Sequence, residues 1–256
     1  MFIVPELHNP EELDQIQDLE IRDTDVFVVT YPKSGTIWLQ QILLLLQFKE
    51  LHHSRVSTPQ SDPPAVPLHA HRAQPQEGQG DLRGQKSKDV LVSFYHFQNA
   101  VKVLETDKSF DEVLERFLGG RVPGVGKNWF EHIKTWFSHK DDLNMLFITY
   151  EEMIQDLTSV IKKIADFLET ELTQDQLQNV VKHSTFKNMK KIPQANYEQA
   201  SKLMDKQQGS FMRKGTIGDW KNHFTVAQNE RFDKIFAEEM KDFPVSFIWD
   251  ETDAYS

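Results

Sequence analysis

Residues 25–36 read Asp-Val-Phe-Val-Val-Thr-Tyr-Pro-Lys-Ser-Gly-Thr, and they give the first indication of the fold class. The apolar, β-branched run over 25–32 ends at a proline and predicts a buried strand of a parallel sheet. From Gly35 to Phe48 the apolar residues recur at helical spacing, which predicts a helix. The order strand, tight loop, helix is typical of α/β proteins.

The loop between these two elements has the features of an anion site. Loop N–H groups and the free donors at a helix N-terminus attract anions, Gly35 permits a close backbone approach, and Lys33 adds a positive charge. The loop therefore predicts phosphate binding. An ordinary turn with a solvated Lys33 is the alternative, because the first glycine of a Walker A loop is absent.

Strand and helix patterns continue to alternate along the chain. Residues 144–150 form a second buried-strand candidate, and an amphipathic helix is expected at 151–168. Capping signals at Ser109 and Thr173 predict two more helices, the first ending at Gly119-Gly120, and residues 226–243 predict the last. The alternation predicts an α/β, P-loop-like three-layer fold, with a mainly parallel sheet flanked by helices in a single domain over 1–256.

Composition excludes several classes of protein. A net charge of −10 argues against general affinity for nucleic acid or anionic lipid, and the longest wholly apolar run, residues 42–46, is too short to cross a membrane. No cysteine is present, which excludes disulfides and thiolate chemistry, and no metal-ligand cluster is visible. The first residues lack a secretory signal pattern. We expect a cytoplasmic protein with no metal, nucleic acid or membrane partner.

One stretch departs from this pattern. Residues 54–87 contain five of the 11 prolines, and no Phe, Tyr, Trp, Ile or Met occurs between Lys49 and Ser93. Such a composition cannot bury enough apolar surface to offset the ordering entropy. We expect an aberrant loop or disordered insert over 54–87, with one strand of the sheet missing or disordered.

Five blocks of sequence, taken together and in order, resemble the cytosolic sulfotransferases. They are residues 30–38, 88–97, 150–152, 184–189 and 211–220. Residues 20–27 and 247–250 are most similar to the amine sulfotransferase branch. The resemblance implies transfer of a sulfuryl group from 3′-phosphoadenosine 5′-phosphosulfate, the co-substrate, to a small amine, phenol or alcohol acceptor, without a metal.

The resemblance also implies roles for individual residues. Lys33 would be catalytic and neutralise the charge that develops on the bridging oxygen. The residues that would hold the 5′-phosphosulfate, with Trp38 also stacking on adenine, are Lys33, Ser34, Gly35, Thr36, Ile37 and Trp38. The 3′-phosphate would be held by Ser93, Arg213, Lys214 and Gly215. The rest of the nucleotide site would be lined by Tyr150, Ser184, Thr185, Phe186, Met189, Phe211 and Met212.

A short motif near the C-terminus resembles the family's dimerisation signal. It consists of Lys221, Thr225, Val226 and Glu230. The resemblance thus implies a homodimer through these residues.

The sequence also departs from the family at the catalytic base. The family's base histidine lies in a Thr-His-Leu-Pro-like segment that is absent here; His69 and His71 fall in the same interval, and whether either substitutes is open. Gln85 stands where the family has an arginine for the 3′-phosphate. We expect impaired activity, with an inactive nucleotide-binding or scaffold isoform as the alternative and a P-loop small-molecule kinase as a third possibility. Without a placed base, an unprotonated amine should react faster than a phenol.

A shifted reading frame explains the unusual stretch. Read from the second nucleotide of each codon, residues 79–87 are compatible with Lys-Gly-Ile-Tyr-Val-Ala-Arg-Asn-Pro, which has the apolar strand and the arginine that the family pattern requires. Sequencing the transcript tests this interpretation.

Overall fold

The computed structural model describes residues 18, 20–22, 25–48, 87–102, 109–122, 128–193, 195 and 211–243. Helices are the regular elements of this part of the chain. In chain order they are α2 (Thr36–Gln47), α3 (Ser87–Ala100), α4 (Phe110–Leu118), α5 (Trp129–Ser138), α6 (Tyr150–Gln155), α7 (Leu157–Phe167), α8 (Gln174–Ser184), α9 (Phe186–Met189), the 3₁₀ helix η3 (Asp219–Asn222) and α10 (Val226–Glu239).

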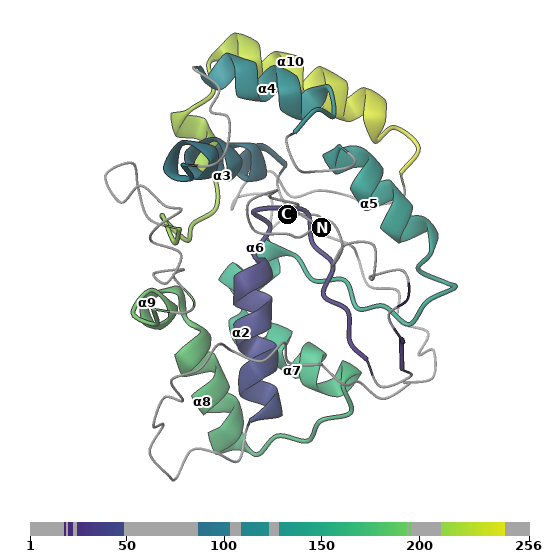
Figure 1. Ribbon diagram of the computed structural model, residues 1–256, viewed down its shortest axis with the longest axis vertical. Coiled ribbons are helices and arrows are strands. Elements are labelled where there is room, and N and C mark those ends of the chain that lie inside the picture. The colour runs from purple at the N-terminus through teal and green to yellow at the C-terminus, as the bar shows by residue number, and fades with distance from the viewer. Residues whose placement is uncertain are drawn as a thin grey trace.

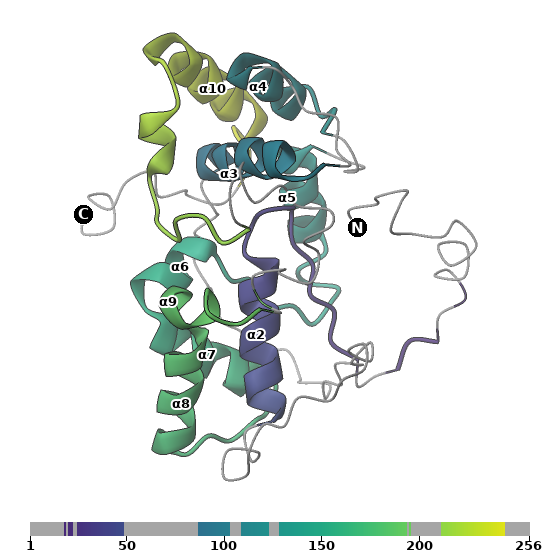
Figure 2. The same ribbon diagram turned by 60° about the vertical axis from the view of Figure 1, so that its left-hand side comes forward.

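The helices form two groups, each around its own apolar cluster. In Figure 1, α3, α4, α5 and α10 occupy the upper half, and α2 lies with α6, α7, α8 and α9 in the lower half. The upper cluster includes Phe94, Phe117 and Phe232, and the lower cluster includes Ile42 and Ile161. Figure 2 shows the same division after a rotation of the molecule.

The predicted phosphate loop joins the two groups. Tyr31 is 2% exposed and packs in the upper cluster, whereas Trp38 is 8% exposed and packs in the lower one. The residues between them therefore pass from one core to the other. Burial of an aromatic residue at each end fixes the position of the loop.

Helix starts follow the sequence signals closely. Ser109 and Thr173 form the predicted capping boxes, with Glu112 and Gln176, and the helix that begins after Ser109 ends with Gly119 as its C-cap. These predictions are confirmed. Thr225 forms a further capping box at the start of α10.

Two predicted helices differ from the structure at their bounds. The single helix expected over 151–168 is divided at Asp156, whose backbone is non-helical and whose side chain accepts a hydrogen bond from the N–H of Ser159. The Asp156 side chain bonds to a backbone N–H group and so caps a new helix. The preceding helix therefore ends at this residue. The last helix ends at Glu239, four residues before the predicted Phe243.

The two predicted strands, 25–32 and 144–150, stay predictions, because no described residue of either run belongs to a regular strand. Asp25 and Val101 make isolated bridges, and no described segment is a β-strand. A strand requires a neighbour that satisfies its backbone N–H and C=O groups, and the described residues show regular pairing along neither run. Phe27 is accordingly 59% exposed and Val29 44% exposed.

Residues 54–86 of the predicted insert lie outside the described residues. The place of the strand that we expect to be missing or disordered lies outside them as well. The last residue of the insert, Ser87, is described, and it begins α3 and is fully buried. The expectation of a loop or disordered insert is therefore wrong at Ser87, because this residue lies in a helix and is buried.

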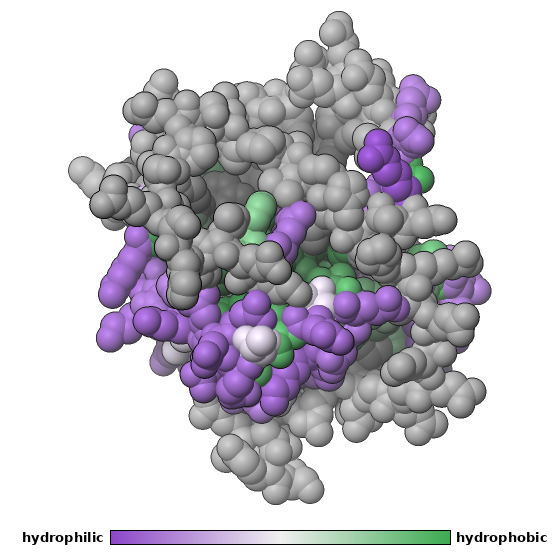
Figure 3. Space-filling view, turned by 90° about the horizontal axis from the view of Figure 1, so that it is seen from below, coloured by the Kyte–Doolittle hydropathy of each residue, from purple (hydrophilic) through white to green (hydrophobic). Residues whose placement is uncertain are grey.

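The described residues at the lower end of the molecule expose mainly polar side chains (Figure 3). Figure 3 shows hydrophilic side chains around smaller apolar areas on this face. Within the described ranges, no helix is long and apolar enough to span a bilayer.

Candidate functional site

A cavity of about 160 Å³ lies where the two groups of helices meet. Its lining comprises Lys33, Gly35, Thr36, Ile37, Trp38, Asp89, Ser93, Tyr150, Phe186, Met189, Phe211, Met212, Arg213, Lys214, Gly215, Thr216 and Asp219. The structure brings together all of the site residues predicted from sequence except Ser34, Ser184 and Thr185. It adds three that sequence reasoning missed, namely Asp89, Thr216 and Asp219.

The phosphate loop turns sharply before α2. Lys33 and Gly35 both have positive φ, 71° and 94°. This conformation is costly for lysine, and the bond from the N–H of Ser34 to the carbonyl of Tyr31, 3.1 Å, closes the turn. Gly35 is the N-cap of α2 and provides no side-chain cap, which leaves the first N–H groups of α2 without one. The Ser34 hydroxyl is also buried without a partner, and such groups suit an anion.

Lys33 lies between two aromatic rings. Its Nζ is 3.9 Å from the ring centroid of Phe211 and 4.4 Å from that of Phe97. Burial and, to a smaller extent, the charge of Arg213 together lower the pKa of Lys33 to about 7. An anion in the cavity would raise this pKa and favour the protonated, positively charged form of Lys33.

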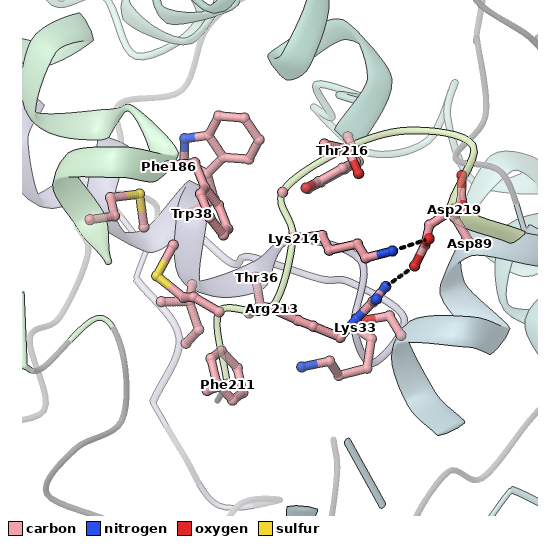
Figure 4. Close-up of a pocket in the computed structure, with 17 residues that line it drawn as sticks. Lys33, Thr36, Trp38, Asp89, Phe186, Phe211, Arg213, Lys214, Thr216 and Asp219 are labelled. Atoms are coloured by element: carbon pink, nitrogen blue, oxygen red, sulfur yellow. Dashed lines mark hydrogen bonds and ion pairs between the residues drawn. The ribbon is translucent and has the colours of Figure 1, made fainter. Parts of the chain in front are cut away.

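One side of the cavity is a charged wall, which we define as Ser93, Arg213, Lys214 and Asp219. Asp219 lies between the two cations, with Arg213 Nη2 at 2.6 Å and Lys214 Nζ at 2.5 Å, as Figure 4 shows. Burial alone would raise the pKa of Asp219, but hydrogen bonds from Lys214, Asn222 and Arg213 hold it far below its usual range. Asp219 thus orients both cations.

Asp89 ties this wall to α3. Its carboxylate accepts hydrogen bonds from the N–H groups of Gly218, at 2.7 Å, and Trp220, at 2.9 Å. These bonds cap the start of η3, the short helix that carries Asp219. The contact spans about 130 residues of sequence, so spacing alone could not have identified it; an acidic residue in the first turn of α3 was the only local signal.

The opposite side is an aromatic wall, which we define as Trp38, Tyr150, Phe186 and Met189. Trp38 donates its Nε1–H to the carbonyl of Ser184 at 2.7 Å, and its ring meets Tyr150 edge-on at 5.4 Å. Burial, followed by the charge of Glu151, raises the pKa of the Tyr150 hydroxyl, which stays neutral. Ser184 does not line the cavity, but it holds the indole ring that does.

Gly215 lies where the two walls approach each other. It has a φ of 70°, and a Cβ at this position would lie 2.3 Å from the ring of Phe186. Only glycine allows this approach. Thr185 bonds to the carbonyl of Lys182 and so helps to position Phe186 from outside the cavity.

A smaller cavity of about 20 Å³ adjoins Lys33. Ser93, His96, Phe97, Ala100, Phe211 and Arg213 complete its lining. His96 Nε2 lies 2.8 Å from His223 Nε2. Neither histidine was predicted from the sequence as a site residue. The candidates weighed from the sequence, His69 and His71, lie outside the described residues.

The residues of the dimerisation motif surround the start of α10. Lys221 lies in η3, Thr225 is the N-cap of α10, and Val226 is 76% exposed. Glu230 lies on the exposed surface one turn later. Across the described ranges, no group of three or more histidine or carboxylate side chains could hold a metal ion.

Comparison with known proteins shows which family this chain resembles. The sequence profile of the sulfotransferase domain matches residues 23–72 and 85–244. The amine sulfotransferase of Oryctolagus cuniculus is 44% identical over 270 residues, which cover 94% of this chain and 89% of that protein. Sulfotransferase 2B1 of Rattus norvegicus is 36% identical over 96% of this chain and 79% of its own length.

Solved structures agree as well. The mouse sulfotransferase SULT7A1 complexed with PAP is 28% identical, with a TM-score of 0.67 over 91% of this chain and 90% of that one. Retinol dehydratase in complex with androsterone and the inactive cofactor PAP has a TM-score of 0.72 at 22% identity, over 91% of this chain and 85% of that one. The profile match and the 44% identical relative together establish that the chain belongs to the sulfotransferase family and has its α/β fold.

Proposed function

We propose that this protein transfers a sulfuryl group from 3′-phosphoadenosine 5′-phosphosulfate to a small amine or hydroxyl acceptor. The observation that carries the proposal is the meeting of a cationic loop, a charged wall and an aromatic wall in one cavity. A nucleotide with two separated anionic groups and one base matches these three features. Two structural relatives were solved with PAP, the adenosine bisphosphate product, which supports the same ligand here.

The residues fit this ligand in chemistry and position. The loop from Lys33 to Trp38, with the free N–H groups of α2, would hold the 5′-phosphosulfate. The hydroxyl of Ser93, the guanidinium of Arg213, the ammonium of Lys214 and the backbone at Gly215 would hold the 3′-phosphate. Trp38 would stack on the adenine, with Tyr150 edge-on behind it and Phe186 beside it.

Lys33 would carry the transfer chemistry. As the sulfuryl group leaves, negative charge grows on the oxygen that joins it to the 5′-phosphate. A lysine ammonium at the phosphate loop stabilises this charge in the manner of an oxyanion hole. The rings of Phe97 and Phe211 exclude water around its Nζ, which strengthens the interaction.

The acceptor is a small amine, phenol or alcohol in this proposal. The relatives include an amine sulfotransferase and hydroxysteroid sulfotransferases, which use such groups. We further propose that the chain acts in the cytoplasm as a homodimer, with the exposed Val226 at the contact between copies.

Two measurements test the proposal. Titration calorimetry with adenosine 3′,5′-bisphosphate should detect binding, and turnover of the phosphosulfate against a panel of amines and phenols should detect transfer. Lys33→Ala should lower turnover by about 10²–10³-fold, since one transition-state donor is lost. The matched control is Lys140→Ala, an exposed lysine beyond α5, which should leave turnover unchanged.

The outcomes separate enzyme from binding protein. Binding without turnover for every acceptor would favour the inactive scaffold isoform instead. Turnover that survives Lys33→Ala would contradict the role of the loop. Absence of binding at millimolar nucleotide would contradict both functions.

A further inference from the structure

The small cavity beside Lys33 places a histidine next to the transfer site. His96 and Lys33 both line this cavity of about 20 Å³, which has room for roughly one water-sized group. The remaining lining is mostly apolar, with Phe97, Ala100 and Phe211. Lys33 and Arg213 line both cavities, so a group in the small cavity meets both the ammonium of Lys33 and the imidazole of His96.

A chain of hydrogen bonds determines which nitrogen of His96 carries a proton. The carbonyl oxygen of Asp219 can only accept, so His223 Nδ1, at 3.0 Å, donates to it. In the uncharged pair His223 Nε2 is then an acceptor, and His96 donates its Nε2–H to it at 2.8 Å. This assignment leaves a lone pair on His96 Nδ1.

We infer that His96 is the proton acceptor of the reaction and that His223 is its positioning residue. The inference rests on the proposed sulfuryl transfer. The carbonyl of Asp219 holds the tautomer of His223, which holds the tautomer of His96. This arrangement resembles the way in which a second group orients the base in other acid–base sites.

The step balances in atoms and charge. The acceptor oxygen or nitrogen forms a bond to sulfur while the bond from sulfur to the bridging oxygen of the 5′-phosphate breaks. The bridging oxygen keeps the electron pair, and Lys33 stabilises it. The acceptor's proton moves to Nδ1 of His96, which becomes an imidazolium and later releases the proton to solvent.

The charges around His96 lower its pKa, so we expect it to act as a base only when the nucleotide is bound. The pKa of His96 is lowered to about 4, mainly by burial and then by the positive charge of Arg213, with smaller effects of His223 and Lys214 in the same direction and of Asp219 in the opposite one. Lys33 also faces the same small cavity. Bound phosphate groups offset the cations, so the pKa of His96 rises toward a useful range when the nucleotide is present.

The test compares acceptors that differ in their need for a base. His96→Gln keeps a donor toward His223 but removes the basic nitrogen. With 4-methylphenol, which must lose a proton during attack, kcat/KM should fall about 10²–10⁴-fold. With 4-nitrophenol, which is partly ionised at neutral pH, the loss should be much smaller. His139→Gln, an exposed histidine at the end of α5, is the control and should change neither rate.

Two results would overturn the inference. Equal losses on both phenols, or no loss on either, would mean that His96 does not take the proton. Calorimetry with adenosine 3′,5′-bisphosphate on the same variant checks that the site still folds and binds. If the wild-type chain binds this nucleotide but sulfates no acceptor, the proposed function fails together with the inference, which distinguishes that case from a failure of His96 alone.

A second measurement observes the tautomers of the two histidines directly. Nitrogen NMR of the histidine-labelled protein at pH 8 should show Nδ1 of His96 unprotonated and Nδ1 of His223 protonated. His223→Phe, used to assign the signals, should remove this tautomer preference at His96. A proton on Nδ1 of His96 in the wild-type protein would contradict the inference.

Discussion

The aromatic wall and the charged wall of the cavity are held in place by different forces. Trp38, Tyr150 and Met189 pack with the lower cluster, and a single bond from the indole fixes the ring of Trp38. Arg213 and Lys214 are instead held by ion pairs to Asp219, whose helix is capped by Asp89. Packing is insensitive to salt and pH, whereas ion pairs respond to both.

This difference suggests how each wall would bind the proposed nucleotide. The aromatic wall is held by packing, so we expect it to accept the proposed nucleotide without rearrangement. The cations of the charged wall already share one carboxylate and must divide their hydrogen bonds between Asp219 and an incoming phosphate. Affinity from the first wall should thus come from stacking, and affinity from the second from charge.

The largest effect is expected where the walls touch. In Gly215→Ala the new Cβ would clash with the ring of Phe186, and the positive φ adds strain, so nucleotide affinity should fall about 100-fold or more and stability by about 2–3 kcal/mol. Gly218→Ala is the matched control, since its φ of 85° carries the same strain but nothing lies within 4 Å of the new Cβ. Calorimetry and thermal unfolding measure both effects. Equal losses of affinity in the two variants would show that the contact between the walls is unimportant.

The next effect separates the two walls by their response to salt. Arg213→Gln removes a charge-assisted contact and should weaken nucleotide binding by about 1.5–3 kcal/mol, roughly ten- to a hundredfold. Trp38→Leu removes stacking and should cost about 1–3 kcal/mol. Raising the salt concentration should weaken binding by wild type and Trp38→Leu more steeply than by Arg213→Gln. If nucleotide affinity depended equally on salt in all three proteins, the proposed difference between the stacking wall and the charged wall would be contradicted.

A smaller effect concerns pH. Because the pKa of Lys33 is about 7 in the empty cavity and a bound anion raises it, binding takes up a proton above pH 7. Affinity should therefore fall as pH rises, about fivefold from pH 7 to 8 and about tenfold from pH 8 to 9 while Lys33 stays charged in the complex. Lys33→Arg, which keeps its charge throughout this range, should show an affinity nearly independent of pH. Calorimetry across this range makes the comparison.

The smallest effect on the cavity is expected at the start of α10. Val226→Glu places a charge on an exposed apolar residue of the proposed dimer contact and should shift the chain toward monomer in sedimentation experiments. Nucleotide affinity should stay within about threefold of wild type, because neither wall includes this residue. An unchanged oligomeric state would argue against the motif as the dimer contact.

Local signals in the sequence identified much of the site. The order of Lys33, Gly35 and the apolar residues of α2 is enough to predict a loop before a helix, because each feature acts over a few residues. Capping residues such as Ser109 and Thr173 act over one turn and were read correctly. The cationic pair Arg213-Lys214 was found through resemblance, since two adjacent charges alone carry little information.

What the sequence by itself determined is therefore most of the helix starts, the loop before α2 and the family pattern. Only the tertiary structure decided that Phe27 is exposed, that Asp219 and Asp89 organise the charged wall, and that His96 adjoins Lys33. The physical reason is the distance along the chain between the residues that interact. A capping bond or helical spacing is contained within one segment, whereas strand pairing, ion pairs and shared cavities depend on residues that the chain brings together from distant segments.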